Sequence, residues 1–400
     1  MLPGIGIFGT GDVTKVLVPF LREKGFNIVG LWGPVLKEAE EVAKLLSIPF
    51  FTNRIDDVLL RKDVDLIFVL CPPYLHSQIS VKALGIGKHV MCDKPFGISQ
   101  LDALKMVKAG QYYPSLISIV NYSLRFLPAF AYMKKAIADG YIGAPHEISL
   151  IDIRVRMGTL LHNTYDWLCD STMGGGILNL VGSHVIDLVT FLTDRKAIKV
   201  HGVVRTYTMN TAQVAGIRTI TAPDFCTFQL ELEGGTLVTA NLHSHVSSTT
   251  FNQEVLICGS AGHLTVRGGD LIGHKLKGDP GELKEEVIYL DVQDLALPNS
   301  DTSLPKPYVK GLYKMVGNLA AAFHPNNQEQ VQGTPGQVNW IKSPVQLAAN
   351  FEDGLYVQAV LDAIRKSSDE RAWQRVSIVS ESPNNNAKYL QAARMGAKIM

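Results

Sequence analysis

The stretch Ile5-Gly6-Ile7-Phe8-Gly9-Thr10-Gly11-Asp12-Val13-Thr14 determines the fold of the first part of the chain. Residues 5–8 are continuously apolar and β-rich, and residues 13–23 have the pattern of a helix. Between them, Gly9 permits a tight turn and Gly11 lets a pyrophosphate approach the backbone at the helix N-terminus. The third glycine of the usual G-x-G-x-x-G pattern is Thr14 here. The segment predicts a dinucleotide-binding turn, to which Thr10, Asp12 and Val13 also contribute, and a glycine turn without a ligand is the alternative.

The same alternation of strands and helices continues for about a hundred residues. Further strands are predicted at residues 28–32, 66–70, 89–92 and 115–120, and further helices at residues 33–46, 77–84 and 100–109. Continuously apolar strands separated by helices are typical of a parallel sheet that is covered on both faces. We therefore predict a doubly wound α/β domain of the Rossmann type over residues 1–122.

After Asn121 the pattern changes to that of an α+β domain. Strand-like runs separated by glycine-rich turns are predicted at residues 199–208, 225–232, 236–242, 254–258, 263–266 and 286–290, and helices at residues 130–138, 178–192, 312–323 and 344–365. We predict a mostly antiparallel sheet with helices over residues 123–382. The polar, Asn-rich residues 383–400 are expected to form a mobile tail.

Composition excludes several classes of protein. The chain has 400 residues, is 46% hydrophobic and 19% charged, and carries 38 Lys and Arg against 37 Asp and Glu. A net charge of +1 offers no basic excess for nucleic acid, and no apolar run approaches the ~20 residues of a membrane span. The start of the chain has no basic region typical of a cleavable signal. Five widely spaced cysteines indicate reduced thiols, so we expect a cytoplasmic protein.

The carboxyl ends of the predicted parallel strands indicate where a cofactor would bind. Trp32 and Gly33 end the second strand. An acidic residue there would select NAD and an arginine would select NADP. Neither is present, so the choice between NAD and NADP stays open. Cys71, Pro72 and Pro73 follow a later strand and are predicted to face the cofactor. His76 either lines the same site or begins the next helix.

Lys94 is the strongest candidate for a catalytic residue. The segment Lys88-His89-Val90-Met91-Cys92-Asp93-Lys94-Pro95 places it at the carboxyl end of a buried strand, with a proline behind it. Partial burial and a cationic nicotinamide ring would lower the pKa of its amine, which suits proton transfer. The alternative is a surface lysine in a turn.

These motifs together resemble the glucose–fructose oxidoreductase / inositol dehydrogenase / rhizopine catabolism (Gfo/Idh/MocA) family. The run His89-Val90-x-Cys92-Asp93-Lys94-Pro95 is similar to the family's HVxxEKP signature, and the N-terminal Gly-x-Gly, the Pro72 loop, Arg125-Phe126 and Gly174-Gly175-Gly176 follow in the family's order. Within the family, the segments 83–88, 125–130 and 351–356 look like those of the animal glucose–fructose oxidoreductase domain-containing proteins.

The resemblance implies an open antiparallel sheet in the second domain and a set of site residues. Asp93 and Lys94 would lie beside the nicotinamide and substrate, and Asn121 near the carboxamide. The family's second element, G-G-G-x-L-x-D-x-G-x-H, corresponds to residues 174–184, so His184 matches its acid/base histidine. The residues expected to bind substrate are Arg125, Trp167, Asn179, Leu180 and His184.

Two positions, one in this second element and one before it, depart from the family pattern. Leu180 replaces the aspartate, and Leu168, after the retained Trp167, replaces an arginine. Neither leucine can hydrogen-bond a sugar hydroxyl, so the site is expected to be more apolar than that of bacterial sugar enzymes. A satisfied helix histidine is the alternative for His184.

Three functions are compatible with this sequence. The first is an NAD- or NADP-dependent oxidoreductase that acts on a small hydroxylated or carbonyl substrate. The second is a lyase or hydrolase that recycles its cofactor, and the third is a non-catalytic dinucleotide-binding scaffold. His243-x-His245 lacks a third ligand, so no metal site is predicted. The exposed face of the second sheet predicts a homodimer or a larger homo-oligomer.

Overall fold

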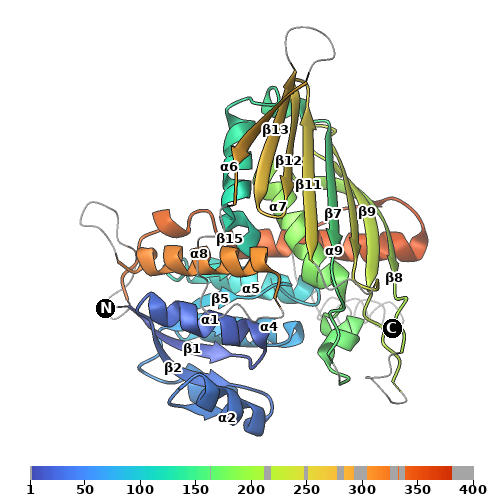
Figure 1. Cartoon of the computed structure of the whole chain (residues 1–400). Coiled ribbons are helices and arrows are strands. Elements are labelled where there is room, and N and C mark those ends of the chain that lie inside the picture. The colour runs from blue at the N-terminus through green and yellow to red at the C-terminus, as the bar shows by residue number, and fades with distance from the viewer. Residues whose placement is uncertain are drawn as a thin grey trace, which may run out of the picture.

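The computed structural model describes residues 2–162, 164–210, 218–246, 251–276, 283–291, 304–324, 332 and 338–380. Two sheets organise these residues, one in the N-terminal part of the chain and a larger one in the C-terminal part (Figure 1). The predicted tail over residues 383–400 lies outside the described residues.

The first sheet confirms the predicted doubly wound α/β fold. Its strands are β1 (Gly4–Phe8), β2 (Asn27–Trp32), β3 (Phe51–Thr52), β4 (Leu66–Val69), β5 (His89–Cys92), β6 (Ser118–Val120) and β15 (Ala349–Asn350), in the order β15-β6-β5-β4-β1-β2-β3. Every neighbouring pair is parallel except β15 with β6. All residues of β4 and β5 are buried, as in a sheet covered on both faces.

Helices cover both faces of this sheet. The sheet therefore has one apolar layer on each face. One layer contains α1 (Asp12–Glu23), α2 (Leu36–Leu45) and α8 (Lys306–Ala322), and the other contains α3 (Ile55–Leu59), α4 (His76–Gly85), α5 (Gln100–Tyr112) and α9 (Phe351–Glu370). The helix α8 and the strand β15 come from the C-terminal part of the chain, yet they lie against the first sheet. The sequence did not predict this return.

The second sheet has nine strands and is open. The strands are β7 (Leu150–Arg156), β8 (Ala197–Arg205), β9 (Phe225–Leu232), β10 (Leu237–His243), β11 (Asn252–Gly259), β12 (Gly262–Arg267), β13 (Asp270–Leu276), β14 (Leu283–Tyr289) and β16 (Gln374–Arg375), in the order β14-β13-β12-β11-β7-β10-β9-β8-β16. The sheet is antiparallel except for the pair β7 and β10, which agrees with the predicted mostly antiparallel sheet.

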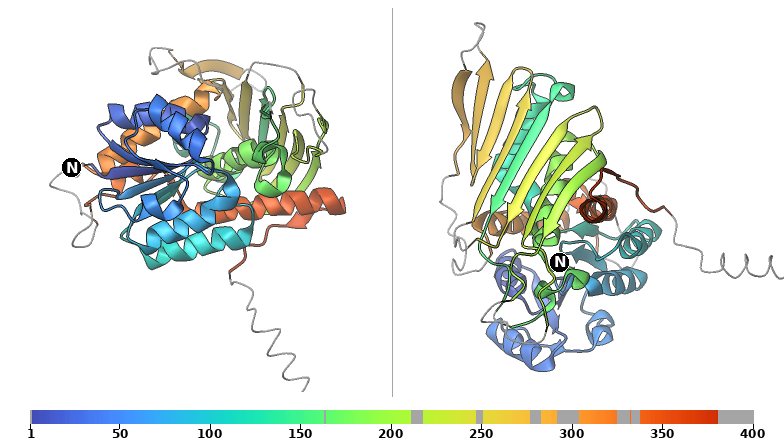
Figure 2. Two further views of the ribbon diagram at one scale, coloured as in Figure 1. Left: turned by 90° about the horizontal axis from the view of Figure 1, so that it is seen from below. Right: turned by 90° about the vertical axis from the view of Figure 1, so that its right-hand side faces the viewer.

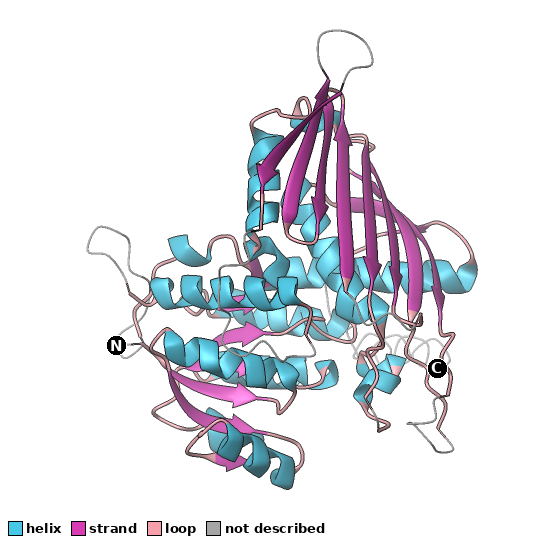
Figure 3. Ribbon diagram, in the orientation of Figure 1, coloured by secondary structure: helices cyan, strands magenta, loops and turns pink. Residues whose placement is uncertain are grey.

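One face of the second sheet packs against helices and the other does not. The inward residues of β7, such as Ile151 and Ile153, are buried against α7 (Ser183–Thr193), α9 and α6 (Pro128–Ala138), whereas Arg154 and Arg156 on the other face are exposed. Figures 2 and 3 show described helices on only one side of this sheet. The uncovered face remains the surface through which we expect association.

Several predicted element boundaries are wrong. The helix predicted over residues 344–365 is interrupted, because Ala349–Asn350 extends to pair with β6 and α9 begins only at Phe351, where Asn350 caps it. The short elements β3 and α3 and the strands β7 and β13 were not predicted. These strands are stabilised by pairing with strands that are distant in the chain. The local sequence pattern does not show such pairing.

The most apolar helical stretch belongs to the core. Within the described residues, Ser171–Thr193 is long and apolar enough to span a membrane, but 94% of its apolar window is buried inside the fold. All five cysteines are unpaired, and only Cys258 is not fully buried.

Candidate active site

The glycine turn between β1 and α1 needs its two glycines for different reasons. Gly9 has φ +135°, and a Cβ there would lie 2.6 Å from the carbonyl carbon and oxygen of Leu70. Gly11 has an ordinary extended backbone, with φ −74°, and a Cβ there would meet nothing within 4 Å. Gly9 is therefore required by the fold, whereas the space beside Gly11 is left open for a ligand.

Thr14 replaces the third glycine of the usual pattern without disturbing the turn. It is fully buried, and its hydroxyl donates a hydrogen bond of 2.8 Å to the carbonyl of Gly9. No side chain caps the start of α1, where Asp12 and Val13 are partly exposed. An uncapped helix N-terminus beside an open glycine suits a pyrophosphate.

Two further predicted cofactor residues lie at the end of β2, next to this turn. Trp32 is only 4% exposed and packs against Phe8, with ring centroids 5.7 Å apart. A Cβ on Gly33 would lie 2.6 Å from Cγ2 of Thr10, so the backbone there is close to the turn. Neither side chain carries a charge, and the choice between NAD and NADP stays open.

The Cys71-Pro72-Pro73 loop follows β4, as predicted, and His76 at the start of α4 contacts this loop. His76 is fully buried and is the first residue of α4. Its Nε2 lies 2.7 Å from the carbonyl oxygen of Cys71, and burial lowers the pKa of the ring, so the neutral imidazole donates to that carbonyl. His76 therefore begins the helix and holds the loop through its Nε2, which agrees with the alternative that the sequence left open.

Asp93 and Asn121 meet at the carboxyl ends of β5 and β6. Asn121 Nδ2 donates to Oδ1 of Asp93 at 2.9 Å, which fixes the orientation of the amide. Asn121 is 5% exposed, and its Oδ1 is buried without a hydrogen-bond partner. Buried polar atoms are rarely unpaired, so this oxygen fits an acceptor for a carboxamide NH2 of a nicotinamide. The residues of the turn and of this strand edge thus fit a nicotinamide dinucleotide.

Lys94 reaches from the first sheet to the helical segment that precedes α7. Its Nζ donates to the carbonyl oxygen of Leu180 at 3.2 Å. Burial lowers the pKa of the Lys94 amine below its usual range, and the nearby Asp93 carboxylate opposes this effect. The predicted cleft lysine is thus held between the two parts of the chain, with an amine that is easier to deprotonate than a surface lysine.

The glycine run before α7 brings Leu180 to this lysine. Gly174 and Gly176 have φ +97° and +96°, and Cβ atoms there would approach within 3 Å of Pro73 and Pro223 respectively. Residues Leu178–Gly182 then form a π-helical turn, a feature common at functional sites. Leu180 therefore contributes a backbone carbonyl to the site, while its side chain is 7% exposed.

His184, in the first turn of α7, lies between two tyrosine rings. It stacks on Tyr308 with ring centroids 4.7 Å apart and an interplanar angle of 14°, and it meets the edge of Tyr122 at 5.9 Å. Burial and the charge of Lys94 lower the pKa of His184 well below its usual value, so the ring is neutral. Its Nδ1 is buried without a hydrogen-bond partner.

Tyr308 was not predicted as a site residue. It comes from the first turn of α8, more than 120 residues after His184, and nothing in its local sequence marks it. The hydroxyls of Tyr308 and Tyr122 are both buried without a partner. Together with Asn121 Oδ1 and His184 Nδ1, they give four buried, unpaired polar atoms, as expected for a site that receives a polar ligand.

The geometry gives Arg125 a structural role, and its predicted contact with substrate stays a prediction. Its Nη2 and Nε lie 2.5 Å and 2.9 Å from the carboxylate oxygens of Asp187, which is 1% exposed. Nη2 also lies 3.2 Å from a carboxylate oxygen of Asp353. Arg125 thereby joins its own segment to α7 and α9, and these carboxylates occupy its guanidinium.

Asn179 is also engaged within the protein. It is 4% exposed, its Nδ2 donates to the carbonyl of Gly175 at 3.2 Å, and its Oδ1 accepts a hydrogen bond from Arg365. The amide therefore holds the glycine run and α9 together, so the predicted role in binding substrate is not supported. Trp167 is half-buried, and its carbonyl oxygen would lie 2.7 Å from a Cβ on Gly175.

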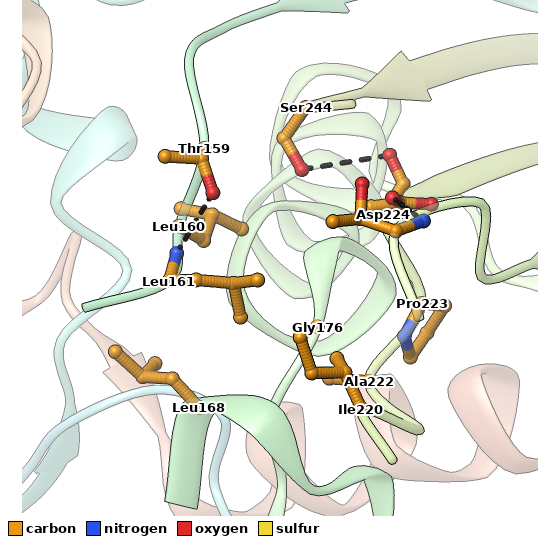
Figure 4. A pocket seen from close by; sticks show the side chains of 11 residues that line it. Thr159, Leu160, Leu161, Leu168, Gly176, Ile220, Ala222, Pro223, Asp224 and Ser244 are labelled. Atoms are coloured by element: carbon orange, nitrogen blue, oxygen red, sulfur yellow. Dashed lines mark hydrogen bonds between the residues drawn. The ribbon is translucent and has the colours of Figure 1, made fainter. Parts of the chain in front are cut away.

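A small pocket lies beside Gly176 of the glycine run (Figure 4). Its lining includes Leu161, Leu168, Gly176, Ile220 and Asp224, but neither Lys94 nor His184. Its free volume of about 20 Å³ holds about one water molecule. The pocket is too small for a sugar-sized substrate, and the Lys94 region is the better candidate.

The comparisons with known proteins agree with this geometry. Residues 4–118 match the sequence model of an oxidoreductase family with an NAD-binding Rossmann fold, and residues 130–265 match the GFO/IDH/MocA C-terminal domain. Glucose-fructose oxidoreductase domain-containing protein 1 of Xenopus tropicalis is 44% identical over 398 residues, 99% of this chain and 98% of the relative. Glucose-fructose oxidoreductase domain-containing protein 2 of Homo sapiens is 43% identical over 395 residues, 98% of this chain and 98% of the relative.

Solved structures show the same fold at lower identity. Levoglucosan dehydrogenase in complex with NADH and L-sorbose has a TM-score of 0.75 at 17% identity, over 94% of this chain and 99% of that chain. A super-repressor mutant of Gal80p from Saccharomyces cerevisiae has a TM-score of 0.73 at 16% identity, over 96% and 100%. The chain therefore belongs to the Gfo/Idh/MocA family of oxidoreductases, and its first domain is a Rossmann fold of the NAD-binding type.

Proposed function

We propose that this protein is a nicotinamide-dependent oxidoreductase that interconverts a hydroxyl and a carbonyl on a small substrate, with Lys94 as the proton-transfer residue. The observation that carries the proposal is the environment of the Lys94 amine. Burial makes it less basic, and the unpaired polar atoms of Asn121, Tyr122, His184 and Tyr308 belong to the same site.

The contact between Lys94 and Leu180 orients the amine for this role. A carbonyl oxygen can only accept a hydrogen bond, so one N–H of Lys94 points at Leu180. The lone pair of the neutral amine therefore points elsewhere and can accept the proton of a substrate hydroxyl. The bound nicotinamide would supply the chemistry of hydride acceptance and donation.

His184 would assist as a neutral hydrogen-bonding group. Because its pKa is well below the usual range, the ring does not carry a charge that competes with protonation of Lys94. Stacking on Tyr308 replaces the orientation that the family's aspartate would give from position 180. This arrangement supports a neutral substrate that offers both donors and acceptors.

A non-catalytic dinucleotide-binding protein is the second candidate. Leu168 and Leu180 occupy the positions of the family's arginine and aspartate, and both side chains are buried. The fold does not decide this question, since levoglucosan dehydrogenase and the Gal80p super-repressor share it. Lys94 and His184 favour the enzyme, because an amine with a lowered pKa beside unpaired polar atoms suits proton transfer. Binding a dinucleotide does not require such an amine.

A substrate screen with variants at Lys94 tests the proposal. The purified protein is assayed with NAD and with NADP against neutral sugars and polyols, including levoglucosan and myo-inositol. Lys94→Ala should lower kcat on the best substrate by about 100-fold or more and leave cofactor affinity nearly unchanged. Lys105→Ala, on the exposed side of α5, is the matched control.

Each result of the screen separates two candidate functions. Net change in cofactor absorbance distinguishes an oxidoreductase from a lyase or hydrolase that recycles its cofactor. Full turnover by Lys94→Ala would exclude the proposed proton transfer. Cofactor binding without turnover of any compound would favour the scaffold.

A further inference from the structure

Gln253 is a buried polar residue that the fold leaves without partners. It lies in β11 next to the start of that strand, and it is 2% exposed. Neither Nε2 nor Oε1 of its carboxamide has a hydrogen-bond partner. Among the fully described side chains, no other amide is buried with both of its polar atoms unpaired. The amide of Gln358, by comparison, donates to Asp362 at 2.9 Å.

The strand places Gln253 on the face of the sheet that carries the site. Gln253, Val255 and Ile257 alternate with more exposed residues, so all three point toward the helices. Phe251 precedes Gln253 by two residues and therefore lies on the same face. The Phe251 ring meets that of Tyr308 at 5.4 Å, and Tyr308 stacks on His184. Contacts between rings thus join Phe251, the residue that precedes β11, to the candidate catalytic histidine.

Packing alone does not explain a glutamine at this position. A buried amide without partners is destabilising, and an apolar side chain of the same length would avoid that cost. Unpaired buried polar groups are rare in folded proteins and are often functional. A carboxamide both donates and accepts hydrogen bonds, so it matches a hydroxyl or a pair of neighbouring hydroxyls.

We infer that Gln253 contacts the substrate and determines which substrates are accepted. It would hydrogen-bond a substrate hydroxyl that is remote from the hydroxyl whose proton Lys94 accepts. This inference rests on the proposed function, because it assigns a residue of β11 to the same substrate. Gln253 supplies the polar contact that Leu180 and Leu168 cannot, so the second sheet takes over part of the recognition. The structure thereby assigns substrate selection to a strand in addition to the glycine run.

Gln253→Met separates this role from a structural one, because methionine has nearly the same length and no amide. If the amide serves only the substrate, the unliganded variant should be as stable as the wild type or melt about 2–4 °C higher. Its kcat/KM for the best polyol should fall about tenfold, with NADH affinity unchanged. Gln78→Met, at an exposed position of α4, is the control and should change none of these values.

The two measurements decide the inference together. A melting temperature several degrees lower in Gln253→Met would show that the amide stabilises the fold, for instance through buried water, and would overturn the inference. Unchanged kcat/KM on a polyol that the wild type oxidises would also overturn it. If the wild type turns over no compound, the proposed function fails, and the inference that Gln253 contacts substrate fails with it. A stable variant would then show only that the fold does not need the amide.

Discussion

Gly11→Val is the sharpest test of the cofactor site, because the structure separates its effect on binding from its effect on folding. The backbone of Gly11, with φ −74° and ψ −176°, is one that valine adopts readily, and a Cβ there meets no atom within 4 Å. Valine is a poorer helix cap than glycine by about 1 kcal/mol or less. We therefore expect the free energy of unfolding to change by no more than about 1 kcal/mol.

The expected effect on binding is much larger. The valine methyl groups would occupy the space through which a pyrophosphate approaches the start of α1. Losing two hydrogen bonds to a charged group, each worth about 1.5–3 kcal/mol, weakens the affinity at least about 100-fold, since 1.4 kcal/mol corresponds to tenfold.

Gly9→Ala is the matched contrast. Gly9 has φ +135°, and a Cβ there would lie 2.6 Å from the backbone of Leu70. We expect a loss of about 2 kcal/mol or more in unfolding free energy from strain alone. Calorimetric titration with NADH and NADPH, together with thermal melts, measures both effects. Wild-type affinity for both nucleotides in Gly11→Val would refute the assignment of this turn to the cofactor.

Other predictions address the chemistry, the ion pair and the assembly. In the oxidation direction, kcat/KM should rise as pH increases through the lowered pKa of Lys94, because only the neutral amine accepts a proton; a pH profile without that limb would contradict the assignment. His184→Ala should lower kcat less than Lys94→Ala does, measured on the same substrate. Tyr308→Phe should raise KM severalfold with unchanged melting temperature, since the lost hydroxyl has no partner in the protein; a lower melting temperature would indicate a structural hydroxyl. Arg125→Ala should destabilise the protein by about 3–5 kcal/mol in denaturant titrations, because it leaves Asp187 buried and unpaired, and wild-type stability would exclude the structural role. Light scattering at micromolar concentration should show a homodimer or larger oligomer, formed through the uncovered face of the second sheet, whereas a monomer would count against it.

The sequence was sufficient for the features that depend on neighbouring residues. Continuous apolar strands, a glycine turn and alternating helices predicted the doubly wound sheet, and the position of Lys94 at a strand end followed from it. Parallel strands carry their carboxyl ends to one edge of the sheet, so residues after β1, β4 and β5 had to meet there. The resemblance to the family also identified His184 and the glycine run before it as candidate site residues.

The tertiary structure decided the features that depend on distant segments. The return of α8 to the first sheet brings Tyr308 onto His184, and the alternation along β11 places Gln253 on the buried face of the second sheet. The structural role of Arg125 could not be predicted, because a sequence shows a charged side chain but not the partner that neutralises it, here Asp187, 62 residues later. Local pattern fixes periodicity and turns, whereas the partners of a buried polar group are set by packing between segments far apart in the chain.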